Sequence, residues 1–139
     1  MKLTFALTAM LFLCSCFNLK YRKVEPVEQI FSSLPNCENL PSFIRKNWYK
    51  HRTGNHYYCT SNFKENLIPN FFDCLKDLDY DQVEQIFGAS FEKDDIIMFY
   101  YIGEGCEKPL RENCEMLIFV CSSNKKVHSV SFQGANSLK

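Results

Sequence analysis

Three residues with metal-binding side chains lie close together in the sequence: His51, His56 and Cys59. Imidazole nitrogens and thiolates are typical zinc ligands, usually four of them in a tetrahedral set. The spacing here matches no standard zinc finger, and no second pair of ligands follows. In an oxidising compartment, Cys59 would instead pair with another cysteine. The sequence therefore predicts no metal site and no cofactor, with a zinc site as the alternative.

Other catalytic patterns are also missing from the sequence. It contains no G-x-S-x-G or H-E-x-x-H motif and no glycine-rich phosphate loop after a predicted strand. The carboxylates of Asp94 and Asp95, and of Asp77, Asp79 and Asp81, are grouped, but at positions typical of helix caps and turns. We assign His128 a structural or surface role, because it lies in a predicted strand. No catalytic residue is predicted, and we expect no enzyme and no small-molecule substrate.

The charges of the whole chain balance, with 16 basic and 16 acidic residues among 139. A nucleic-acid-binding protein needs a basic excess on its surface, so this class of partner is not expected. The 13 phenylalanines and 7 tyrosines suffice for a packed core, and the length suggests one domain.

The N-terminus is typical of an export signal. Lys2 is followed by an apolar stretch from Leu3 to Leu13, which is too short to span a membrane. Ser15 then precedes Cys16, and a small residue before a cysteine at this place is similar to a bacterial lipobox. We predict cleavage before Cys16 and acylation of Cys16, which would anchor the protein to a membrane. The alternative is an ordinary secretory signal.

Removal of this signal leaves six cysteines besides Cys16. An even number in a small exported domain indicates a disulfide framework, but six cysteines allow 15 pairings. The six are Cys37, Cys59, Cys74, Cys106, Cys114 and Cys121.

The second half of the chain carries the clearest secondary-structure pattern. Asp79 and Gln82 have the spacing of a capping box, and Gly88 is suited to end the helix that they begin. A longer helix should precede it, starting at Asn62 and kinked or divided at Pro69. Three strands should follow, at residues 94–102, 114–121 and 127–132, because these segments are rich in β-branched and aromatic residues. This order predicts an α+β fold in which a helical hairpin packs on a three-stranded antiparallel sheet.

The first half predicts less regular structure. A short helix should cover residues 27–34, and a second should run over 42–51 with Pro41 at its first position. Residues 53–60 resemble a turn around Gly54. The predicted organisation is a signal peptide at 1–15, a tether at 16–27, a helical extension at 28–60, the α+β core at 61–133 and a tail at 134–139.

This plan suggests a disulfide pairing. Cys106 and Cys114 flank the connection between two antiparallel strands and are expected to pair. Cys121 should join Cys74 if its strand faces the long helix, which leaves Cys37 to pair with Cys59.

The helix and strands together resemble the SmpA/BamE family of outer-membrane assembly lipoproteins. The matching residues run in order through Gln82-Val83, Ile86-Phe87-Gly88, Met98 to Tyr101, Leu117 to Phe119 and Val127 to Phe132, with Cys16 at the lipidated position. Asp77, Ser90, the six cysteines and the N-terminal extension depart from that pattern. The resemblance implies a helical hairpin on a three-stranded sheet and a non-catalytic role in binding other envelope proteins, in outer-membrane assembly or maintenance.

The expected function is therefore a lipid-anchored envelope protein that binds other proteins. Phe17 replaces the aspartate that retains enterobacterial lipoproteins in the inner membrane, which favours the outer membrane facing the periplasm. The alternative is a disulfide-stapled inhibitor of a lysozyme, protease or β-lactamase, with residues 103–113 as the inserted loop.

Overall fold

The computed structural model describes residues 19–103 and 114–134 of the chain. In chain order the elements are β1 (Tyr21–Lys23), the 3-10 helix η1 (Glu28–Ser33), α2 (Leu40–Asn47), β2 (Trp48–His51), β3 (His56–Cys59), α3 (Ser61–Leu75), α4 (Tyr80–Phe87), β4 (Glu92–Lys93), β5 (Ile97–Ile102), β6 (Glu115–Cys121) and β7 (Val127–Gly134).

These strands form one mixed sheet, so the prediction of a three-stranded antiparallel sheet is wrong. The described part of the chain makes a seven-stranded sheet in the order β1-β2-β3-β5-β6-β7, with β4 also paired to β5. The predicted meander of β5, β6 and β7 is its second half. Strand β3 joins that meander by pairing parallel to β5, with His56 opposite Tyr101. A parallel pair between segments so distant in sequence leaves no local signal.

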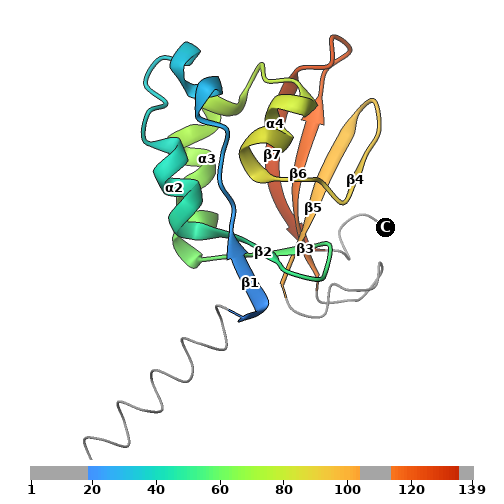
Figure 1. Cartoon of the computed structure of the whole chain (residues 1–139). Helices are drawn as coiled ribbons and strands as arrows, with labels where there is room; N and C mark the ends of the chain where they lie inside the picture. The colour runs from blue at the N-terminus through green and yellow to red at the C-terminus, as the bar shows by residue number, and fades with distance from the viewer. Residues whose placement is uncertain (1–18, 104–113, 135–139) are drawn as a thin grey trace, which may run out of the picture.

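Helices α2, α3 and α4 pack on one face of the sheet, while β1, β2 and β3 cross beneath them (Figure 1). The main hydrophobic core lies between these layers. A smaller cluster lies on the opposite face of β5 and β6, where Tyr101, Met116 and Ile118 are buried. The sheet is therefore apolar on both faces.

The capping box predicted for α4 is confirmed. The Asp79 carboxylate accepts from the Gln82 backbone N–H at 2.8 Å, and the Gln82 side chain accepts from the Asp79 N–H at 3.0 Å. Val83, Ile86 and Phe87 are fully buried on one face of the helix. Gly88 ends it with φ of 91° and ψ of −178°, a region that only glycine adopts readily.

Three aromatic side chains of the core bind the three carbonyls at the end of α4. Trp48 Nε1 donates to the Phe87 carbonyl at 2.8 Å, and the Tyr100 hydroxyl donates to the Gly88 carbonyl at 2.8 Å. The Tyr57 hydroxyl donates to the Ala89 carbonyl at 2.7 Å. Helix-end carbonyls need such partners when they are buried. This arrangement fixes α4 to strands β2, β3 and β5.

The first half of the chain is more regular than predicted. Tyr21 is buried in β1, although the sequence suggested a loose tether there. Trp48 to His51 form β2 instead of the last turn of a helix, and the predicted turn contains β3. Helix α3 begins after Thr60, whose hydroxyl accepts from the Phe63 N–H, and not at Asn62. It continues past Pro69 as one helix.

Candidate functional site

The structure brings together the two histidines of the alternative zinc set but separates them from the cysteine. The His51 and His56 rings stack with centroids 4.4 Å apart. His51 Nδ1 accepts the Gly54 backbone N–H at 2.9 Å, so this nitrogen is used by the turn. Along β3, His56 and Cys59 point to opposite faces because side chains alternate. Nowhere in residues 19–103 and 114–134 do three metal-binding side chains converge.

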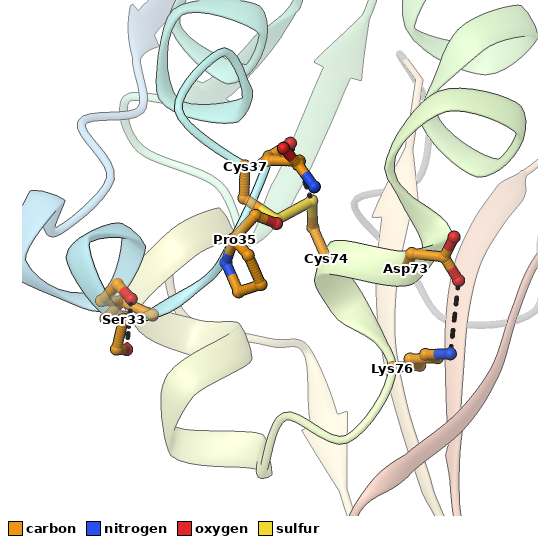
Figure 2. Close-up of a disulfide and its surroundings, with 8 residues drawn as sticks. Ser33, Pro35, Cys37, Asp73, Cys74 and Lys76 are labelled. Carbon is orange, nitrogen blue, oxygen red and sulfur yellow. Dashed lines mark hydrogen bonds and ion pairs between the residues drawn. A yellow bond between two sulfur atoms is a disulfide. The ribbon is translucent and has the colours of Figure 1, made fainter.

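The cysteine pairing differs from the one predicted. Cys37 is bonded to Cys74, and Figure 2 shows this disulfide joining the loop after η1 to the last turn of α3. The predicted Cys37–Cys59 and Cys74–Cys121 pairs are therefore wrong. The reason lies in the unpredicted strands: Cys59 is held in β3 opposite Trp48, while the chain near Cys37 packs against the end of α3.

Cys59 and Cys121 are buried free thiols. Burial raises the pKa of Cys59 to about 12 and also raises the pKa of Cys121. A thiolate is the reactive form of cysteine, so neither thiol is suited to nucleophilic catalysis. They fill core positions as small apolar side chains.

The remaining predicted residues are placed only in part. Cys114 is disulfide-bonded, whereas Cys106, its predicted partner, and Cys16, the predicted lipidation site, lie outside the described residues. His128 is exposed on β7, in line with a surface role. Asp79 caps α4 as expected, and Asp94 occupies the turn before β5.

The most suitable binding surface is an apolar hollow on the sheet face that carries no helix. Its volume is about 230 Å³, and it lies over β5 and β6. The walls are Ile97, Phe99, Ile118 and Val120, with Glu92, Asp94 and Gln133 at the rim. A concave apolar surface with a few polar groups at its edge is typical of a binding site.

Two exposed isoleucines lie at the turn between β4 and β5, and one of them, Ile97, lines the hollow. Ile96 is 60% exposed and Ile97 is 37% exposed. Asp94 holds the turn, because its carboxylate accepts the backbone N–H groups of Ile96 and Ile97, each at 2.7 Å. These two hydrogen bonds lower the pKa of Asp94. The exposed isoleucines are thus presented on a fixed turn.

A charged groove adjoins the hollow at Asp94. Its volume is about 440 Å³, and its lining comprises Tyr80, Asp81, Lys93, Asp94, Asp95 and Lys125. Lys93 contacts Glu84 at 2.8 Å and Asp81 at 3.6 Å. Burial alone would raise the pKa of Glu84, but hydrogen bonds from Lys93 and Ser90 lower it overall. The two depressions together offer an apolar pocket beside an acidic rim.

This surface was not predicted from the sequence. Ile96 and Ile97 fall in a predicted strand, and their spacing does not show which side chains the helices leave uncovered. The only available signal was the run of apolar residues directly after two aspartates.

Comparison with family models, curated proteins and solved structures gave no match to the chain.

Within the part of the chain that the structure describes, no helix is both long and apolar enough to traverse a membrane.

Proposed function

We propose that the protein is a non-catalytic, lipid-anchored envelope protein that binds a partner protein through the hollow on β5 and β6. The observation that carries the proposal is an apolar hollow whose wall includes the exposed Ile97. Adjoining exposed apolar side chains with a polar border commonly mark protein-binding surfaces. The export signal and Cys16 support a location in the cell envelope, and we propose the periplasmic face of an outer membrane.

The partner segment can be described by its chemistry. An apolar side chain would fill the hollow against Phe99 and Ile118. Glu92 and Asp94 at the rim are exposed carboxylates, so a lysine or arginine next to that apolar side chain would gain a favourable charge contact. We therefore propose an extended apolar segment flanked by basic residues, consistent with a role in assembly or maintenance of the envelope. Lipid anchoring would raise the local concentration of both proteins.

Site-specific photo-crosslinking in native membranes tests this role. A crosslinker at position 97 should capture one defined partner, and Val120→Asp, in the opposite wall of the hollow, should abolish the capture. Val27 is 40% exposed and lies against α4, where its N–H donates to the Gln85 carbonyl, so crosslinker placement at 27 and Val27→Asp are matched controls on the helix side. Equal capture at positions 97 and 27, or unchanged capture with Val120→Asp, would refute the proposal. The captured peptide should contain an apolar residue next to Lys or Arg.

The anchor has a separate test. The intact mass of the mature protein from its native host should begin at Cys16 and include acyl chains. A mass without acyl chains would refute the proposed anchor, but it would not affect the proposed binding surface.

A second candidate function is inhibition of a hydrolase. Cys114 is disulfide-bonded, which fixes one end of the connection between β5 and β6. Residues 104–113, the proposed inserting loop, lie outside the described residues. A panel of lysozymes, proteases and β-lactamases tests this reading, and unchanged activity of all of them would exclude it.

A further inference from the structure

The charges of this neutral chain are separated toward two ends of the molecule. Residues 19–24 and 46–60 contain six basic residues and no acidic one: Lys20, Arg22, Lys23, Lys46, Lys50 and Arg52. Residues 73–95 contain eight acidic residues and only two lysines. Figure 1 places β1 and β2 at the end where the described chain begins, and α4 with the β6–β7 turn at the other end.

The basic end contains like charges that face one another. In the register of β1 and β2, Arg22 lies opposite Lys50. The Arg52 N–H donates to the Lys20 carbonyl at 2.9 Å, which continues this ladder by one more pair of basic residues. Like charges directly opposite each other on a sheet are unfavourable. An anionic surface outside the domain would relieve the repulsion between Arg22 and Lys50.

Ion pairing of the basic side chains differs between the two ends. At the acidic end Lys76, Lys93, Lys125 and Lys126 each contact a carboxylate within 4 Å. At the basic end, Arg22, Lys23, Lys46 and Lys50 form no ion pair within the described residues. Lys50 instead lies over the Tyr57 ring, 5.9 Å from its centroid. These four basic side chains are therefore available to an external ligand.

We infer that this basic end, defined by β1, β2 and the end of α2, rests on anionic phospholipid headgroups and directs the hollow away from the membrane. The inference uses the proposed lipid anchor for its choice of ligand, because only four residues separate Cys16 from Tyr21. A tether this short would hold β1 near the bilayer. Basic residues at an anionic surface each contribute about 1 kcal/mol, which corresponds to about fivefold in the docking equilibrium.

Lysine labelling on vesicles tests the orientation. The full chain would be reconstituted into phosphatidylcholine vesicles with and without anionic phosphatidylserine, then treated with an amine-reactive reagent. Lys46 and Lys50 should become protected only on the anionic vesicles, and high salt should remove the protection. Lys76 and Lys125 at the acidic end are internal controls and should label equally on both.

One charge reversal separates lipid contact from folding. Lys50→Glu would place a carboxylate opposite Arg22, so the fold should be retained and the melting temperature should not fall. The change of two charge units should weaken docking about 30-fold, which is read as lost protection of Lys46. Lys125→Glu, with the same charge change at the other end, should leave the protection intact.

Other outcomes would overturn the inference. These are equal protection on neutral vesicles, protection of Lys125 as well as Lys46, or binding of an oligonucleotide without any protection on anionic vesicles. Partner crosslinking at position 97 does not depend on this result, so failure here would leave the proposed binding function standing, and failure of the crosslinking would leave this orientation testable.

Discussion

Substitution of Gly88 should destabilise the protein through two separable effects. Its φ of 91° and ψ of −178° lie in a region that other residues adopt at a cost of about 1–3 kcal/mol. A Cβ atom at this position would also lie 2.8 Å from the Tyr57 hydroxyl oxygen, which must then leave the Ala89 carbonyl. Losing a buried hydrogen bond costs about 1 kcal/mol. Gly88→Ala should therefore cost about 3 kcal/mol in total.

A double-mutant cycle with Tyr57→Phe isolates the contact. Tyr57→Phe alone should cost about 1 kcal/mol for the lost hydrogen bond. In that background the new Cβ meets no hydroxyl, so Gly88→Ala should cost only the backbone part, about 2 kcal/mol. The two changes together should be about 1 kcal/mol less harmful than their sum. This coupling exceeds the scatter of about 0.3–0.5 kcal/mol seen for independent sites.

Urea unfolding followed by circular dichroism measures these costs. With a slope of about 2 kcal/mol/M, Gly88→Ala should lower the midpoint by about 1.5 M. Gly103→Ala is a matched control, because Gly103 also has a positive φ of 112° but a Cβ there would meet nothing within 4 Å. Its cost should not change in the Tyr57→Phe background. Additive effects of Gly88→Ala and Tyr57→Phe would refute the steric argument.

Three further predictions follow from the cysteines and from Asp94. Replacing Cys37 and Cys74 by serine opens a cross-link over a sequence separation of 37 and should lower the free energy of unfolding by about 4 kcal/mol in calorimetry; a change below about 1 kcal/mol would contradict this. Native protein treated with iodoacetamide should stay unmodified at Cys59 and Cys121, because both are buried and burial raises the pKa of each thiol, and both should react once urea unfolds the chain. Rapid alkylation of native protein would show that these thiols are accessible. The Asp94 carboxyl should titrate below its ordinary pKa in NMR, because two backbone N–H groups stabilise the charged form. Its contribution to stability should be present above the unfolded-state pKa and lost as the pH falls through the lowered folded-state pKa. Asp94→Ala should abolish this acid-dependent term, and an unshifted titration would contradict the hydrogen bonding.

Local patterns predicted the second half of the fold well. The cap at Asp79, the apolar face of α4 and the order of β5, β6 and β7 all depend on neighbours within a few residues. The prediction of the first half was wrong for the opposite reason: its structure depends on distant residues. Trp48 to His51 follow α2 without a break, and their state is decided by pairing with β1 and β3. No spacing within the segment carries that information.

The candidate site was unpredictable for a similar reason. Whether Phe99 and Ile118 are covered depends on which sheet face the helices occupy. The disulfide shows the same limit, since the partner of Cys37 was set by how η1 and α3 meet. Asp94 was expected at a turn and also at the start of the strand 94–102; the turn is confirmed by its hydrogen bonds to Ile96 and Ile97, and β5 begins only at Ile97.

The hydrogen bond from Trp48 to the Phe87 carbonyl makes the fluorescence of Trp48 sensitive to folding of the protein. Trp48 is the single tryptophan of the chain. It is fully buried, stacks on Tyr57 at 4.7 Å and on Phe63 at 4.9 Å, and reaches the end of α4. Its indole environment is therefore complete only after segments 39 residues apart have docked. During synthesis β2 emerges before α4. A change in the fluorescence of Trp48 would therefore mark the time at which α4 docks on the first half of the chain.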